Sequence, residues 1–78
     1  MTRRTNRATK DLEHLPQVLR DKAEALIERL QNEPALGKKL KGKLDGKRSL
    51  RLGRTHRIIY TSDPLVILTV VARRDAYR

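Results

Sequence analysis

The chain has 78 residues, a length that suits one small domain, so residues 1–78 are expected to form a single unit. It contains no cysteine, which excludes a disulfide framework and a thiolate metal site, and no apolar run approaches the roughly 20 residues that a membrane helix needs. Nineteen lysines and arginines against nine acidic residues give a formal net charge of +10. This balance predicts a polyanionic partner in the cytoplasm, nucleic acid before acidic proteins, with a merely soluble basic surface as the alternative.

The first half of the chain is predicted to form two helices joined as a hairpin. Residues 8–14 favour a short helix with Thr5 or Asn6 as its N-cap, because either side chain can accept a hydrogen bond from the first turn. Residues 16–31 favour a longer helix, which Pro34 ends because proline cannot continue it. One stripe of this second helix is apolar, at Leu19, Ala23, Leu26, Ile27 and Leu30.

A loop and three strands are predicted in the second half. Residues 35–46 are basic and contain glycine, so we expect a loop there, with a turn or two of helix as the alternative. Three leucines are expected to anchor this loop to the core, at Leu36, Leu40 and Leu44. After it the apolar period changes to two, which predicts strands at residues 48–52, 56–62 and 65–73, joined by short turns as antiparallel neighbours. The predicted fold is an α+β domain, a helical hairpin packed on a small antiparallel β-sheet.

Alternation along the predicted strands assigns their side chains to two faces of the sheet. The even-numbered positions are nearly all apolar and are expected to lie under the helices, namely Leu50, Leu52, Ile58, Tyr60, Val66, Leu68 and Val70. The odd-numbered positions carry Arg51, Arg57 and Arg73, which converge on one cationic surface if the strand pairing keeps this parity. Basic residues of the loops and the carboxy-terminal tail would extend that surface, namely Lys41, Lys43, Lys47, Arg48, Arg54 and Arg74. Cations on a rigid sheet suit a phosphate backbone, while for any one of them a solvated surface position is the alternative.

No metal and no small-molecule cofactor is predicted. His14 and His56 lie far apart, no carboxylate cluster has metal-ligand spacing, and there is no glycine-rich phosphate loop. His56 is a candidate general base near neutral pH, but its even parity favours a structural position. Tyr77, in the basic tail, is a surface aromatic, a stacking partner for a base, or a carrier of a proton.

The order and spacing of several short segments resemble the RelE/ParE superfamily of toxins from bacterial and archaeal toxin–antitoxin modules. The likeness covers residues 5–78, and it is carried by Ala8-Thr9-Lys10-Asp11-Leu12, Gly37-Lys38-Lys39-Leu40, Leu40-Lys41-Gly42, Leu50-Arg51-Leu52-Gly53, His56-Arg57-Ile58-Ile59-Tyr60 and Arg73-Arg74-Asp75-Ala76-Tyr77. It implies the family's RelE-like fold of two helices on an antiparallel sheet. It also implies an apolar first strand, and because residues 1–5 are few and polar we expect that strand to be shortened.

The resemblance to RelE-like members implies a metal-independent endoribonuclease that cleaves messenger RNA on the ribosome and so inhibits translation. In that chemistry the substrate's own 2′-hydroxyl attacks the adjacent phosphate, and the protein orients the attack, stabilises the charged phosphorane and helps to move protons. By position in the family pattern, Arg57 and Arg73 would hold the phosphate. Arg51 would stand where the family places a catalytic lysine or arginine, and Tyr77 would stack on the base or transfer a proton.

The partners implied are messenger RNA on the ribosome and a cognate antitoxin, whose acidic, amphipathic segment would cover the basic surface. Two departures from the family pattern bear on activity. Ser49 stands near the place of a second basic residue, and Ala72 stands where relatives often carry a histidine. Two other functions stay open, a ParE-like inhibitor of DNA gyrase and a nucleic-acid-binding module without catalysis. The arginines with Tyr77 favour the nuclease, because a gyrase-binding protein needs no group of residues that holds a phosphate.

Overall fold

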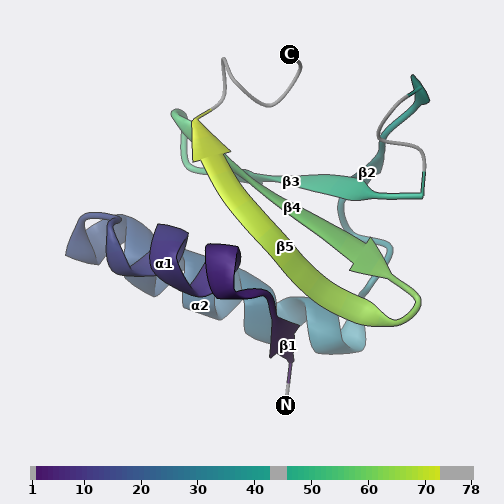
Figure 1. Ribbon diagram of the computed structural model, residues 1–78, viewed down its shortest axis with the longest axis horizontal. Coiled ribbons are helices and arrows are strands. Elements are labelled where there is room, and N and C mark those ends of the chain that lie inside the picture. The colour runs from purple at the N-terminus through teal and green to yellow at the C-terminus, as the bar shows by residue number, and fades with distance from the viewer. Residues whose placement is uncertain (1, 43–45, 73–78) are drawn as a thin grey trace.

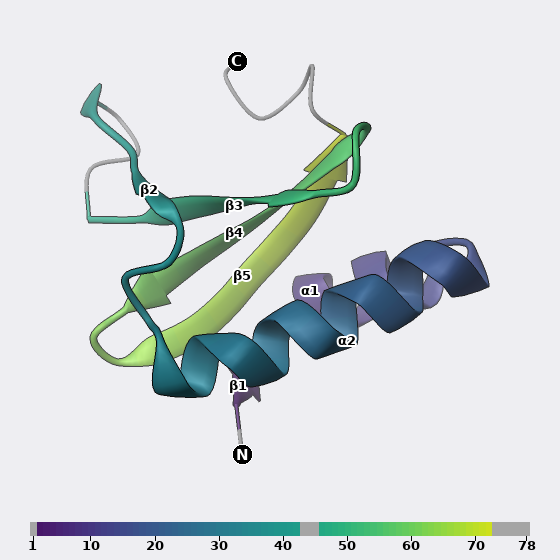
Figure 2. The same cartoon turned by 180° about the vertical axis from the view of Figure 1, so that it is seen from behind.

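The computed structural model describes residues 2–42 and 46–72. Along them lie, in chain order, β1 (Arg3–Arg4), α1 (Asn6–Glu13), α2 (Gln17–Asn32), β2 (Lys38–Lys39), β3 (Arg48–Leu52), β4 (His56–Ser62) and β5 (Leu65–Ala72). Figures 1 and 2 view the molecule from opposite directions, and both show α1 and α2 on the same side of the sheet. Within the described residues the other side of the sheet has no helix over it, and we call it the open face. The α+β class and the helical hairpin on a sheet are as predicted.

The helical hairpin matches its predicted limits within two residues at each end. Thr5 is the N-cap of α1, because its hydroxyl accepts a hydrogen bond of 3.0 Å from an amide of the first turn. Arg20 holds the corner between the helices, where its guanidinium donates to the backbone carbonyls of Leu12, Glu13 and Leu15. The Leu12 carbonyl also accepts a hydrogen bond of 3.2 Å from the amide of Leu15, and the arginine adds donors to the carbonyls at and just after the end of α1, where backbone carbonyls lack full helical pairing. No helix in the described part of the chain has the length and apolar character to cross a membrane.

The strands form one mixed sheet in the order β1-β5-β4-β3-β2. Its centre, β3, β4 and β5, is the antiparallel meander that alternation predicted. Two short strands extend it, because β1 pairs parallel with β5 and β2 pairs antiparallel with β3. The first strand is thus short, as expected for a polar terminus. The prediction of a loop throughout residues 35–46 is wrong at Lys38–Lys39, where a strand too short to show alternation forms.

The predicted division of β5 into two faces is wrong in its first half, because the pairing of β4 with β5 shifts register. Tyr60 lies opposite Ile67, and not opposite Leu68 as unbroken pairing would give. One extra residue in β5 makes a β-bulge, which turns the neighbouring side chains to the other face. Ile67 is therefore fully buried under the helices, whereas Val66 and Leu68, which were predicted to lie there, are half-buried.

The core lies between the hairpin and the sheet. Its buried members are Ala8, Leu12, Leu15, Ala23, Ile27, Leu30, Leu52, Ile58, Tyr60, Ile67 and Val70. The Tyr60 hydroxyl donates to the carbonyl of Pro34 at 3.0 Å and accepts a hydrogen bond of 2.7 Å from the amide of Gly37. Burial raises the pKa of the Tyr60 hydroxyl, so it stays protonated near neutral pH. This one side chain therefore ties the segment after α2 to the centre of the sheet.

Candidate functional site

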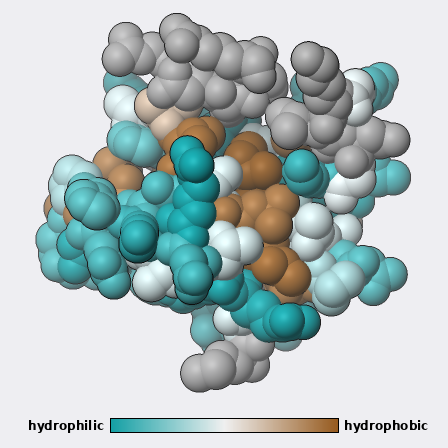
Figure 3. Space-filling view, viewed as in Figure 1, coloured by the Kyte–Doolittle hydropathy of each residue, from teal (hydrophilic) through white to brown (hydrophobic). Residues whose placement is uncertain are grey.

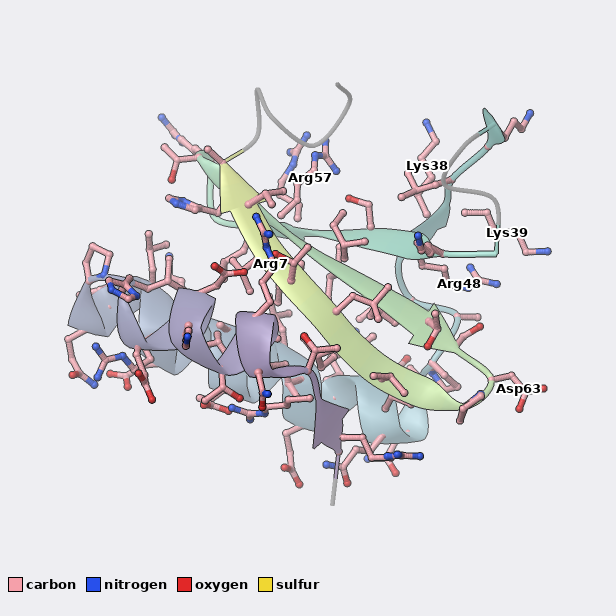
Figure 4. All side chains as sticks on the ribbon, viewed as in Figure 1. Arg7, Lys38, Lys39, Arg48, Arg57 and Asp63 are labelled. Atoms are coloured by element: carbon pink, nitrogen blue, oxygen red, sulfur yellow. The ribbon has the colours of Figure 1, made fainter. Side chains whose placement is uncertain are left out.

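Cross-strand pairing gathers cationic side chains on the open face. Residues directly opposite each other on antiparallel strands point to the same face, and their neighbours in sequence point to the other. Leu50 and Ile58 form such a pair and belong to the apolar core under the helices. The next pair along the same two strands is Arg51 with Arg57, which therefore points away from the helices. Figure 4 shows the Arg57 side chain extending in that direction.

Among the described cations of this surface, Arg57 is held in place by a side-chain hydrogen bond and by partial burial. It lies on the central strand β4 and is half-buried. Its Nη1 donates to the hydroxyl of Ser49 on β3, in a long hydrogen bond of 3.4 Å. Ser49 is only 2% exposed, so its hydroxyl is a fixed support. The guanidinium of Arg57 is therefore held against the sheet with its orientation restricted.

The pairing of Arg51 with Arg57 brings two guanidinium groups directly opposite each other on β3 and β4. Like charges directly opposite each other on neighbouring strands destabilise a sheet. Arg51 is exposed, which weakens the repulsion through water but does not remove it. Guanidinium groups bind phosphate oxygens through paired, charge-assisted hydrogen bonds. The arrangement is suited to hold a phosphate group between or above the two side chains.

Lys38 joins this surface, although nothing in the sequence pattern pointed to it. It pairs directly with Ser49, so its exposed side chain lies on the open face beside β3. The next residue, Lys39, pairs with Arg48 and points to the helix side. Figure 4 shows the Lys38 and Arg57 side chains extending to the same side of the sheet. Only the register of β2 against β3 reveals this lysine, and a two-residue strand carries no periodicity from which that register could be predicted.

The other predicted binding residues lie around this surface or away from it. Lys41 and Arg54 are exposed, in the segment after β2 and in the β3–β4 turn, and Lys47 is half-buried just before β3. Arg48 faces the helix side, where its Nη1 donates to the carbonyl of Gly37 at 2.8 Å. Of the predicted arginine trio, the structure brings together Arg51 and Arg57. Four predicted site residues lie outside the described part of the chain, namely Lys43, Arg73, Arg74 and Tyr77.

An apolar band borders the cationic residues, along β5 in the middle of the view in Figure 3. Away from the residues that pack against the core, the half-buried aliphatic residues of this strand include Val66, Leu68 and Val71. Val71 lies directly opposite Arg57, so apolar and cationic side chains meet on the open face. Covering apolar surface is favourable by about 25 cal/mol per Å². This side of the molecule therefore suits a partner that is both anionic and partly apolar.

The two histidines do not join this surface. His56 pairs with Leu52, which belongs to the core, and its Nδ1 lies 2.7 Å from the hydroxyl of Thr55. The Nδ1 of His14 lies 2.6 Å from the carbonyl of Lys10 at the end of α1. Among residues 2–42 and 46–72, no three histidine or acidic side chains come together as a metal site would require. The parity argument that favoured a structural position for His56 agrees with its place on the helix side.

The sequence matches the model of a known family, described as the ParE toxin of the type II toxin–antitoxin system parDE, over residues 3–77. A chain of the toxin–antitoxin complex RelBE2 from Mycobacterium tuberculosis is 35% identical, with 94% of this chain and 96% of that one covered and a TM-score of 0.74. A chain of the RelB–RelE antitoxin–toxin complex from Methanococcus jannaschii is 26% identical, with 97% and 95% covered and a TM-score of 0.78. The YoeB/ParE toxin from Agrobacterium tumefaciens, 22% identical, shares the fold with a TM-score of 0.82 over 94% and 99% of the two chains. No curated protein sequence gives a significant match.

Proposed function

The chain belongs to the ParE toxin family, within the RelE/ParE superfamily of type II toxin–antitoxin systems, and from this premise we propose that it is a ribosome-dependent endoribonuclease that cleaves messenger RNA. The observation that carries the proposal is the Arg51–Arg57 pair on the open face, with the Ser49 hydroxyl supporting Arg57. Cleavage of messenger RNA during translation would stop protein synthesis in the cytoplasm. That outcome is a toxin's effect on its own cell.

In the proposed reaction the 2′-oxygen of one ribose forms a bond to the neighbouring phosphorus, and the bond from that phosphorus to the 5′-oxygen breaks. The 2′-hydroxyl gives up its proton and the departing 5′-oxygen takes one up. The products are a 2′,3′-cyclic phosphate and a free 5′-hydroxyl. Negative charge grows on the phosphate oxygens on the way to the phosphorane. Fixed guanidinium groups therefore stabilise the transition state more than the starting state, which is the condition for a faster reaction.

Arg57 is the residue we propose to contact the reacting phosphate most strongly. Its half-buried position lowers the local dielectric, and a restricted side chain loses little entropy when the phosphate binds. Arg51 would contact the same phosphate from the exposed side. Arg73 and Tyr77 complete the proposal through the likeness to the family, as a second phosphate-holding arginine and as the residue that stacks on a base or transfers a proton. Other cations would track the RNA backbone, namely Lys41, Lys43, Lys47, Arg48, Arg54 and Arg74.

A cognate antitoxin is the protein partner that we propose. The relatives RelBE2 and RelB–RelE were solved as complexes of toxin with antitoxin. A net charge of +10 on this chain favours an acidic segment. The apolar band along β5 favours a segment that is also amphipathic. Such a segment would cover both features of the open face at once and so block access of RNA.

The proposal is tested by adding the protein to a reconstituted translation reaction and mapping new 3′ ends on the message. The wild-type chain should produce cuts only on translating ribosomes. Arg57→Ala should reduce the cleavage rate on the order of 10²-fold, as for other groups that stabilise a developing oxyanion. Arg29→Ala is a matched control, because it removes the same charge from an exposed position on α2. Intact message with the wild-type chain would refute the nuclease.

ParE-like inhibition of DNA gyrase is the second candidate, and the family match favours it. It predicts that the chain stops supercoiling by gyrase while the message stays intact. A non-catalytic module would instead bind nucleic acid in a salt-sensitive way without cutting it. The translation and supercoiling assays together separate the three functions.

A further inference from the structure

A second cationic site lies at the opposite end of β3 from Arg51. A hollow of about 190 Å³ opens there between β2, the start of β3 and the end of β4. We call it the basic hollow, and the residues that line it within the described part of the chain are Lys39, Leu40, Gly46, Lys47, Arg48 and Ser62. Three of these six residues are cationic, one carries a hydroxyl and none is acidic. This composition matches an anion site.

The register places the basic hollow mainly on the helix side of the sheet, away from Arg57. Lys39 pairs with Arg48, and Arg48 pairs with Tyr60, which is fully buried under the helices. Ser62 lies two residues beyond Tyr60 on the same strand, so it points to the same side. An anion in the basic hollow is therefore not the anion that the Arg51–Arg57 pair would hold. The two sites lie on opposite faces of the same sheet.

The arginine of the basic hollow is fixed in place by the backbone. Arg48 Nη1 donates to the carbonyl of Gly37 at 2.8 Å and lies 3.4 Å from the carbonyl oxygen of Ala35. Gly37 is in turn held by the hydrogen bond of 2.7 Å from its amide to Tyr60. Arg48 and Lys47 are both half-buried, so their charges are partly removed from water. Like charges held in this way repel one another, and a bound anion relieves both the repulsion and the desolvation.

A larger hollow elsewhere in the molecule lacks this character. It has a volume of about 390 Å³ and is lined by Thr2, Arg4, Glu24, Ile27, Glu28 and Gln31. Its arginine is already paired with Glu24, and the hydrogen bond from Arg4 lowers the pKa of that carboxyl group. Its lining carries two negative charges, on Glu24 and Glu28, and one positive charge, on Arg4, so it does not attract an anion. Among these two hollows, only the basic hollow has the charge to hold an anion.

We propose that the basic hollow binds a phosphate group of the same nucleic-acid strand that occupies the open face. The identity of the strand rests on the proposed function. A volume of 190 Å³ holds a phosphate with a few waters, since a water molecule takes about 30 Å³ in the liquid. The two non-bridging oxygens of a phosphodiester each carry several lone pairs, so together they can accept from a guanidinium, two ammonium groups and a hydroxyl.

The edge strand β2 connects the two faces. Lys38 lies on the open face and Lys39 lines the basic hollow, although their Cα atoms are only about 3.8 Å apart. A strand of RNA that passes over this edge would meet Lys38 first and Lys39 next. The protein would then hold the strand on both sides of β2, and the hollow would contribute to binding but not to the chemical step.

The test is binding to a single-stranded RNA whose 2′-hydroxyls are methylated, because such a strand cannot be cleaved by the proposed reaction. The double variant Lys39→Gln/Lys47→Gln removes two cations from the basic hollow and keeps Arg48 with its carbonyl contacts. The matched control Lys10→Gln/Lys22→Gln removes the same charge from exposed positions on α1 and α2. Affinity is measured over a range of salt concentrations for both variants and the wild-type chain.

We expect the slope of log affinity against log salt concentration to become shallower by about one unit or more in the hollow variant, with little change in the control. Equal losses in the two variants, or no binding of RNA by the wild-type chain, would overturn the proposal. So would weaker binding of a polyglutamate peptide with RNA binding unchanged, because the hollow would then serve an acidic protein. Cleavage of ordinary message is scored separately with Arg57→Ala. If the chain binds RNA through the basic hollow but does not cleave messenger RNA, the proposed nuclease function is overturned and the proposed RNA site in the hollow is supported.

Discussion

Replacing Tyr60 with phenylalanine would remove one hydroxyl that holds two backbone groups. The phenylalanine ring fills the same space, but the amide of Gly37 loses the partner that it has at 2.7 Å, in a buried position. The carbonyl of Pro34 also loses its donor at 3.0 Å, but Pro34 is exposed and water can replace it. A buried polar group left without a partner costs about 1–3 kcal/mol. With one such group, we expect Tyr60→Phe to lower the free energy of unfolding by about 2 kcal/mol.

Thermal and urea unfolding followed by circular dichroism measure this loss. For a domain of this size 1 kcal/mol shifts Tm by about 4–8 °C, so the expected decrease is roughly 8–16 °C. Thr61→Val is a control on the adjacent residue, whose hydroxyl donates to the carbonyl of Pro64 at 2.8 Å near the surface. Its expected effect is below about 1 kcal/mol, because water can replace that bond. A Tyr60→Phe variant as stable as the wild-type chain would refute the role given to this hydroxyl.

The pH dependence of stability gives the same prediction a second, independent test. Because burial raises the pKa of Tyr60, the folded chain keeps this proton at pH values where an unfolded tyrosine, with a pKa of about 10, has lost it. The resulting stabilisation is fully present below the unfolded pKa and is lost as pH rises through the folded pKa. Tyr60→Phe has no proton to lose at this position. The stability difference between the two chains should therefore narrow above about pH 10, and a constant difference would contradict the buried, protonated hydroxyl.

Two further substitutions test the packing around the site. Gly37→Ala would place a Cβ atom 2.6 Å from the Tyr60 hydroxyl oxygen and 2.9 Å from the backbone oxygen of Ser49, so we expect a loss of about 1–3 kcal/mol in urea unfolding, and an unchanged midpoint would contradict this crowding. Asp11→Ala would remove the carboxylate that accepts the amide of Val70 at 3.1 Å, with an expected loss of about 1–2 kcal/mol. Asp11→Asn keeps an acceptor and should recover part of that loss, whereas equal losses in the two variants would show that the hydrogen bond contributes little.

Long periodic segments of this chain could be predicted from the sequence, and short paired segments could not. The apolar stripe of α2 and the alternation in β3 and β4 extend over enough residues to define their elements within one or two positions. β1 and β2 have two residues each and form only because a neighbouring strand offers a free edge. The β-bulge at Leu68, directly after Ile67, also escapes alternation, because one extra residue changes the face without changing the composition.

The arginine pair could be predicted because one tight turn controls it. Arg51 and Arg57 stand at equal distances from the centre of the β3–β4 turn, and a short hairpin turn brings such positions opposite each other. Arg48 is an even-numbered strand residue like Leu50 and Leu52, which pack in the core, and this parity alone indicates that Arg48 lies on the helix side. Its grouping with the loop cations around the open face was therefore wrong. Lys38 could not be placed from its sequence, because its pairing with Ser49 spans a long connection.

The residue that precedes β2 shows how the core controls the position of Lys38 and Lys39. Gly37 immediately precedes β2 and is fixed through its amide to Tyr60 and through its carbonyl to Arg48. β2 has two residue pairs with β3, and on its other side Leu40 is buried and donates its amide to the carbonyl of Lys47 at 3.0 Å. The placement of Lys38 on the open face and of Lys39 in the basic hollow therefore depends on the buried Leu40 after the strand and on the buried hydroxyl of Tyr60 before it. The Arg51–Arg57 pair is set by the β3–β4 hairpin. Loosening the core at Tyr60 should therefore reduce the contribution of Lys38 and Lys39 to RNA affinity more than it changes the position of the two arginines proposed to act on the phosphate.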